Sequence, residues 1–248
     1  YRLPSGEGLG LKPARRQRLG LLGGTFDPIH VGHLAIARAA VEALSLDRLI
    51  IMPTGRSWQK ATAGQASAAD RLAMVRIAVA ADRGPAPDGG GCVWEVDDLE
   101  IRRDGPSYTV DTLAQLRQRL GPDAALVLIL GSDQLRNLAS WHRWEALLSF
   151  AHIAATQRER VPLSDLPPAI DALVAAHGAE ALPDAPCGAI VLFRMPAVPV
   201  SATGLRRSLA AGEQVAALLP PGVEDYIRRH RLFVVPDSPP GNPAGQTR

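Results

Sequence analysis

The chain has 248 residues, of which 46% are hydrophobic and 21% are charged, and this is enough to bury a substantial core. Its 27 basic and 25 acidic residues leave a net charge of +2, which does not indicate a nucleic-acid-binding surface. No apolar run reaches the roughly 18 residues of a transmembrane helix, so we expect no membrane partner. Two cysteines make no disulfide framework, which favours a cytoplasmic protein with reduced thiols.

Apolar runs alternate with helical patterns along most of the chain. In chain order we expect strand 19–22, helix 33–44, strand 48–52, helix 68–81, strand 93–101, helix 111–120, strand 124–130, helices 132–138 and 143–150, strand 152–156, helix 168–176, strand 189–193, and helices 202–211 and 223–229. The helix at 68–81 places Leu72, Val75 and Val79 on one face. This alternation predicts an α/β fold: a Rossmann-like doubly wound parallel sheet with helices on both faces.

The two ends of the chain differ from the part between them. Residues 1–18 and 236–248 are rich in Gly, Pro and polar residues and lack periodicity. We therefore expect a flexible N-terminal tail at 1–18, one domain at 19–235, and a flexible C-terminal tail at 236–248.

The first expected strand leads into a motif that is suited to binding phosphate, Gly23-Gly24-Thr25-Phe26-Asp27-Pro28-Ile29-His30-Val31-Gly32-His33. Paired glycines let the backbone approach a phosphate, and the following helix directs its positive end at the same place. His30 and His33 are about one helical turn apart, so both imidazoles can face one anion and stabilise charge growing on a phosphoryl group. Taken singly, the glycines also fit an ordinary turn, and the histidines also fit a metal site.

A second candidate phosphate element follows a late strand, Val200-Ser201-Ala202-Thr203-Gly204-Leu205-Arg206-Arg207. Ser201 is placed to cap the helix that begins there. Alternatively, Ser201 and Thr203 face an anion held at the same helix end, onto which the Arg206 guanidinium forks. An ordinary capped helix with solvated arginines fits the same residues.

Together, these two stretches resemble the nucleotidyltransferase superfamily that includes the adenylyltransferases of NAD and coenzyme A synthesis. The second resembles the superfamily's Ile-Ser-Ser-Thr-x-x-Arg element, from which Val200 and Ala202 depart. A third stretch, Pro53-Thr54-Gly55-Arg56-Ser57-Trp58-Gln59-Lys60, occupies the place of Pro-Pro-His-Lys in many relatives. Lys60 is one of only two lysines, which suggests a phosphate contact, although a solvated loop residue fits as well.

Three further stretches resemble those of bacterial nicotinate-nucleotide adenylyltransferases. They are Gly105-Pro106-Ser107-Tyr108-Thr109-Val110-Asp111-Thr112-Leu113, Ile129-Leu130-Gly131-Ser132-Asp133-Gln134-Leu135 and Trp141-His142. The resemblance implies a nicotinate nucleotide site in which Trp141 stacks on the ring, Tyr108 lies near it, and backbone N–H groups of Thr109 and His142 bind the carboxylate. A core aromatic at Trp141 is the alternative.

The resemblance implies a complete assignment of the site. Catalysis falls to His30, His33, Lys60 and Arg206. Binding of ATP and its phosphates falls to Gly23, Gly24, Thr25, Phe26, Gly131, Asp133, Ser201 and Thr203, with Asp133 on ribose hydroxyls unless it only caps the following helix. The expected substrates are ATP and nicotinate mononucleotide, with Mg²⁺ carried on ATP and no dedicated protein metal site.

Several rival functions share parts of these motifs. Phosphopantetheine adenylyltransferases carry the same first motif, but they are generally shorter and lack the Pro-Ser-Tyr-Thr and Trp pair. Nicotinamide mononucleotide adenylyltransferase differs only in the amidated substrate. Class I aminoacyl-tRNA synthetases share a His-x-Gly-His element but are longer. A nucleotide-binding regulator without catalysis is a further possibility, against which the joint presence of His30, His33, Lys60 and Arg206 argues.

Overall fold

The computed structural model describes residues 15–55, 65–82, 91–158 and 166–234. Its centre is a seven-stranded sheet with the order β3-β2-β1-β4-β5-β7-β6, in which every neighbouring pair is parallel. The strands are β1 (Arg18–Gly24), β2 (Arg48–Pro53), β3 (Val93–Val96), β4 (Ala125–Leu130), β5 (His152–Arg158), β6 (Gly178–Ala179) and β7 (Ile190–Met195). The predicted α/β fold with a parallel sheet is confirmed.

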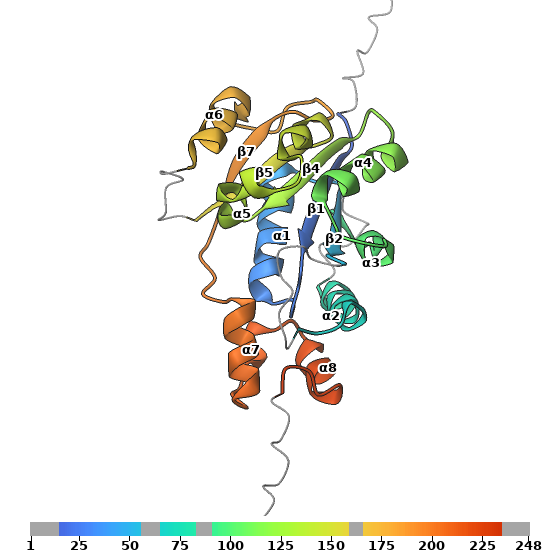
Figure 1. Ribbon diagram of the computed structural model, residues 1–248, viewed down its shortest axis with the longest axis vertical. Helices are drawn as coiled ribbons and strands as arrows, with labels where there is room; N and C mark the ends of the chain where they lie inside the picture. The colour runs from blue at the N-terminus through green and yellow to red at the C-terminus, as the bar shows by residue number, and fades with distance from the viewer. Residues whose placement is uncertain (1–14, 56–64, 83–90, 159–165, 235–248) are drawn as a thin grey trace, which may run out of the picture.

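Helices cover both faces of the sheet (Figure 1). They are α1 (Val31–Leu44), α2 (Ala68–Ala81), α3 (Leu99–Arg102), α4 (Thr109–Leu120), α5 (Ser132–Arg136), α6 (Pro168–His177), α7 (Ala202–Ala210) and α8 (Val223–Arg229), with single 3₁₀ segments η2 (Leu138–Ser140), η3 (Trp144–Ser149) and η4 (Ala216–Leu218). None of these described helices is long and apolar enough to cross a membrane.

The core consists of two clusters, one on each face of the sheet, because successive strand residues point to opposite sides. Leu22 and Ile51 belong to the cluster that packs against α1, α2, α7 and α8. Leu21 and Ile50 belong to the other cluster, which packs against α4, α5 and α6. Buried apolar residues on both faces explain why β4, with all six residues buried, is a continuous apolar run.

The strand expected at 93–101 is too long, because β3 ends at Val96. Asp97 then accepts a hydrogen bond from the N–H of Leu99 (2.9 Å) and Asp98 is the N-cap of α3. Arg102 closes that short helix with an ion pair to Asp98 at 2.7 Å. Aspartates that bind nearby backbone and side-chain donors therefore end the strand.

Two of the expected α-helices, at 132–138 and 143–150, differ in the structure, because one is shorter and the other is a 3₁₀ helix. The segment 132–138 is α5 to Arg136 followed by η2, and 143–150 is the 3₁₀ segment η3. In α2 the bounds agree, but the buried stripe is Arg71, Met74, Val75, Ala78 and Val79, with Leu72 only half-buried beside it.

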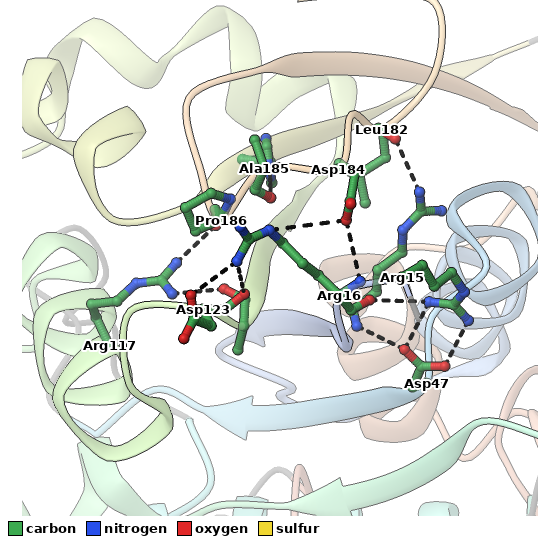
Figure 2. A network of polar contacts seen from close by, with 12 residues as sticks. Arg15, Arg16, Asp47, Arg117, Asp123, Leu182, Asp184, Ala185 and Pro186 are labelled. Carbon is green, nitrogen blue, oxygen red and sulfur yellow. Dashed lines mark hydrogen bonds and ion pairs between the residues drawn. The ribbon is translucent and has the colours of Figure 1, made fainter. Parts of the chain in front are cut away.

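Arginines hold the chain at the amino end of the strands (Figure 2). Arg15 pairs with Asp47 at 2.7 Å, and Arg16 pairs with Asp123 at 3.1 Å. Residues 15–18 of the predicted N-terminal tail thus contact the folded domain, and Arg18 is the first residue of β1. Residues 1–14 and 236–248, which make up the rest of the two predicted tails, lie outside the described residues.

Arg117 of α4 serves the same edge by binding backbone carbonyls. Its guanidinium donates to the carbonyl oxygens of Ala124 (2.7 Å), Phe150 (2.6 Å) and Pro186 (2.8 Å). One side chain therefore holds three loops together at the amino ends of the strands. Ligands in folds of this kind bind at the opposite, carboxyl ends.

Candidate functional site

The candidate site lies where the strand order reverses. β1 has β2 on one side and β4 on the other. The chain adds β2 and β3 outward on one side of β1, and then returns to add β4 and the later strands on the other side. Leu22 pairs with Ile129, which brings Gly23 and Gly24 alongside the residues that follow β4. In open α/β sheets, ligands bind beyond the carboxyl ends of the strands at such a switch point. Among the described residues, a Cβ added at Gly23 would meet no atom within 4 Å, so none of them packs against this glycine.

His33 makes three contacts that fix its orientation. Its Nδ1 accepts a hydrogen bond from the backbone N–H of His30 at 3.2 Å. Its ring stacks on the His30 ring, with centroids 3.7 Å apart, and forms a T-shaped contact with the Phe26 ring, with centroids 4.9 Å apart. Because Nδ1 is an acceptor, a neutral His33 carries its proton on Nε2, which makes that nitrogen a hydrogen-bond donor.

His30 is the N-cap of α1 and is only 7% exposed. Burial lowers the pKa of its imidazole to about 4, so the ring is neutral at physiological pH. Its Nδ1 has no hydrogen-bond partner among the described residues. A Cβ at Gly32 would lie 2.8 Å from Val200 Cγ1 and 3.0 Å from this Nδ1, so glycine lets the two motifs approach each other.

The second phosphate element packs directly against the first. In Figure 1 the connection after β7 leads to α7, which lies beside the end of α1. Arg206 Nη1 donates to the Asp27 carbonyl oxygen at 2.7 Å, and Nη2 donates to Thr203 Oγ1 at 3.4 Å. Ser201 Oγ accepts from the Gly204 N–H at 3.1 Å, which makes it the N-cap of α7.

Asp27 and Arg71 are two buried charges at the site that the motif analysis did not assign. The Asp27 side chain is 2% exposed, and its Oδ1 accepts from the Ala66 N–H at 3.0 Å. Burial raises the pKa of this carboxyl, while the charges of Arg206 and Arg71 oppose that rise. Arg71 could have been noticed as a charged residue at the first position of the apolar stripe of α2.

The residues assigned to the nicotinate ring gather at the start of α4. The Tyr108 and His142 rings lie 4.3 Å apart with a 32° tilt. Thr109 is the first residue of α4, so its N–H is among those that have no partner within the helix. Trp141 is half-buried against the second core cluster, so part of its ring is exposed while the rest serves the core.

Gly131 and Asp133 stand at the end of β4, next to β1. Gly131 is the N-cap of α5, and its N–H donates to Gln134 Oε1 at 3.0 Å. Asp133 is an exposed residue in the first turn of that helix. Thr25 lies at the β1 exit, whereas the Phe26 side chain is 2% exposed, so only its backbone can serve a phosphate. Lys60 lies outside the described residues.

Two features of the surroundings bear on what the candidate site can hold: possible metal ligands and a cavity. In the described part of the chain, no three His, Cys, Asp or Glu side chains are grouped so that they could hold a metal ion. A cavity of about 520 Å³ opens beside α7 and reaches Val200, Ser201 and Gly204, but it contains neither histidine of the first motif.

Comparison with known proteins agrees with this arrangement. Residues 21–208 match the family model described as cytidylyltransferase-like. A protein of Pseudomonas fluorescens called "Probable nicotinate-nucleotide adenylyltransferase" is 44% identical over 224 residues, covering 89% of this chain and 99% of the relative. One of the same name from Laribacter hongkongensis is 41% identical over 219 residues, covering 88% and 95%.

Solved structures show the same fold. The Plasmodium falciparum nicotinic acid mononucleotide adenylyltransferase complexed with NaAD superimposes with a TM-score of 0.63 over 88% of this chain and 98% of that one. At 17% identity this likeness concerns the fold alone. The sequence relatives carry the assignment further: the chain belongs to the nicotinate-nucleotide adenylyltransferase family, among the cytidylyltransferase-like proteins.

Proposed function

We propose that the protein joins ATP and nicotinate mononucleotide to give nicotinate adenine dinucleotide (deamido-NAD) and pyrophosphate, a step of NAD biosynthesis. The single observation that carries this proposal is that Arg206 of the second motif binds the Asp27 carbonyl in the loop after β1, the loop that leads to the stacked rings of His30 and His33. The family assignment supports the choice of substrates.

The reaction is an in-line displacement at the α-phosphorus of ATP. A phosphate oxygen of the mononucleotide forms the new bond, and the bond from the α-phosphorus to the β-phosphate bridging oxygen breaks, with pyrophosphate taking its electron pair. The attacking phosphate is already ionised near neutral pH, so the protein needs no general base. Its task is to align two anions and to stabilise the charge that develops between them.

The proposed donors converge on this charge from three elements. His33, whose neutral tautomer is fixed by the contact at Nδ1, serves a phosphoryl oxygen through its Nε2 proton. The Arg206 guanidinium, held by Asp27 and Thr203, serves a second oxygen. The amino end of α1 and the backbone after Gly23 add further positive ends of dipoles. Lys60, Gly24, Thr25, Ser201 and Thr203 complete the proposed phosphate contacts.

The mononucleotide is proposed to bind at the start of α4. The N–H of Thr109, at the positive end of that helix, and the N–H of His142 bind the ring carboxylate. Tyr108 and Trp141 contact the aromatic ring, and Asp133 at the end of β4 binds ribose hydroxyls.

A divalent metal accompanies ATP in this family's chemistry, and we propose Mg²⁺. Asp27 is the buried carboxylate nearest to the proposed phosphate site, but it lies between two guanidiniums and is unsuited to a cation. Bound with ATP, the ion would supply neutralisation of phosphate charge, and we assign it no ligand among the described residues. One domain at 19–235 and a cytoplasmic location remain part of the proposal.

The test is pyrophosphate release with ATP and Mg²⁺, comparing nicotinate mononucleotide, nicotinamide mononucleotide and phosphopantetheine under identical conditions. We expect the highest kcat/KM with the nicotinate form, because Thr109 and His142 offer donors that match a carboxylate. Preference for another acceptor would overturn the proposed ring site. No pyrophosphate with any acceptor would leave a nucleotide-binding protein without this activity.

A further inference from the structure

Arg71 stands where α2 should present an apolar side chain. It is the first member of the buried stripe that continues with Met74 and Val75, and it is only 5% exposed. A guanidinium at such a place loses its hydration, and burial lowers the pKa of Arg71 below its usual value. A charged group kept at this position has to make contacts that an apolar side chain cannot.

Those contacts are two backbone carbonyls on neighbouring loops. Nη1 donates to the Thr25 oxygen at 2.8 Å, and Nη2 donates to the Gly55 oxygen at 3.0 Å. Thr25 follows β1 and Gly55 follows β2, and these strands already join through the Thr54 N–H and the Gly24 oxygen at 2.8 Å. One planar fork therefore fixes the spacing of the two loops at the site.

The carboxylates near Arg71 are bonded to other groups. Asp27 Oδ1 accepts from the Ala66 N–H, and Glu100 Oε1 accepts from the Thr112 hydroxyl at 2.8 Å. Both carboxylates favour the charged guanidinium through space. They balance the charge of Arg71, while its hydrogen bonds to Thr25 and Gly55 both go to carbonyl oxygens.

Holding the Thr25 carbonyl determines where the next N–H points. In a trans peptide the carbonyl and the following N–H lie on opposite sides of one rigid plane. The N–H of Phe26 belongs to the peptide unit whose oxygen Arg71 holds, so it points away from α2. Phe26 itself has φ 50°, and its ring edge meets His33, so a rotation of this unit would also disturb that imidazole.

We propose that Arg71 is a positioning residue of the site, which aims the Phe26 N–H and the adjoining His33 ring at the phosphates by holding the carbonyls of Thr25 and Gly55. Arg206 holds the Asp27 carbonyl of the same loop, so guanidiniums fix it from two helices. The inference rests on the proposed adenylyl transfer for its kinetic readout only.

The test compares Arg71→Lys with Arg117→Lys. Both changes replace a guanidinium that binds two or more backbone carbonyls by a single ammonium. Arg117, however, acts at the amino ends of the strands, away from the candidate site. We expect Arg71→Lys to lower kcat roughly 10- to 100-fold, since small misplacements of a reacting group have effects of that size. We expect KM for the mononucleotide to change by less than about threefold, as for a contact that matters in the transition state. Arg117→Lys should lower the thermal midpoint and leave kcat unchanged.

A second readout needs no turnover. In ¹⁵N-labelled protein without substrates, inorganic pyrophosphate should shift the Phe26 amide resonance, and Arg71→Lys should displace that resonance and weaken its response. If the unaltered protein releases no pyrophosphate, the proposed function fails while this measurement still tests Arg71.

Three results would overturn the inference. One is a folded Arg71→Lys protein that keeps kcat and the Phe26 response of the unaltered protein. Another is a loss of kcat in Arg117→Lys equal to that in Arg71→Lys, with the two variants unfolding at the same thermal midpoint. The third is failure of both Arg71→Lys and Arg71→Gln to fold, which would make Arg71 a residue of the fold rather than of the site.

Discussion

Replacing His33 separates two roles that one imidazole combines. Nδ1 caps the start of α1 by accepting from the His30 N–H, and Nε2 is the proposed donor to the phosphates. In helices the same third position is often Glu or Gln, which reaches back to the N-cap N–H in the same way. Substitutions at this position can therefore keep the cap while they change the donor.

The magnitudes follow from the contacts that each variant loses. His33→Ala removes the cap, worth about 1 kcal/mol, and the ring contacts to Phe26 and His30, worth about 0.5–1.5 kcal/mol each. We expect a loss of about 2–4 kcal/mol in the free energy of unfolding. Loss of one donor to the developing charge lowers kcat about 100- to 1,000-fold.

His33→Gln and His33→Glu are the matched variants. Both restore the cap, so each should recover about 1 kcal/mol of stability relative to His33→Ala. Gln retains an N–H donor, and its kcat should exceed that of the Ala variant. Glu has no donor and repels phosphate, so its kcat should be no higher than that of Ala.

The assay is pyrophosphate release under saturating substrates, with urea unfolding of each variant beside it. Near-normal kcat in a folded His33→Ala protein would refute the role of Nε2. Equal stability of the Ala, Gln and Glu variants would refute the role of Nδ1 as a cap.

Three other predictions concern His30, Trp141 and Gly55. The pKa of His30 is about 4 in the folded protein, below its ordinary 6.5, so the neutral ring stabilises the fold above pH 6.5 and this contribution is lost as the pH falls toward 4. Urea unfolding should show a loss of about 2–3 kcal/mol between about pH 7.5 and pH 4.5 that His30→Asn does not show; equal pH dependence in both proteins would contradict the assignment. Trp141→Ala should raise KM for the mononucleotide more than KM for ATP in steady-state kinetics, and equal effects would count against ring stacking. Gly55→Ala would bring a Cβ against the Glu100 carbonyl oxygen, so we expect a loss of about 1–3 kcal/mol in the free energy of unfolding, and an unchanged value would show that the backbone there can move.

The sequence predicted the fold best where local chemistry and periodicity agree. The bounds of α2 are as expected because Ser67 caps it, accepting from the Asp70 N–H, and an apolar stripe follows. The strand at 93–101 was too long because the hydrogen bonds of Asp97 and Asp98 are absent from any hydrophobic pattern. The two-residue β6 is too short to produce a pattern at all.

The site divides in the same way. His30, His33 and Arg206 could be proposed from the sequence because side chains suited to binding phosphate occur there at a recognisable spacing. Arg71 was missed because its partners are carbonyl oxygens, which every residue possesses and which leave no trace in the sequence. The roles of the phosphate and ring residues stay predictions until substrates are bound or turned over.

The hydrogen bond between Arg206 and Asp27 has a consequence for the way the protein is made. The two residues are 179 positions apart, and the first strand of the chain lies in the interior of the sheet, between β2 and β4. During translation the Gly23–His33 motif emerges early, but its guanidinium partner emerges only after β7 has been synthesised. A nascent or truncated chain that ends before α7 would hold the two histidines without Arg206. With the proposed role of Arg206, we expect adenylyl transfer only from a nearly complete chain, and prematurely terminated products should be inert rather than partly active.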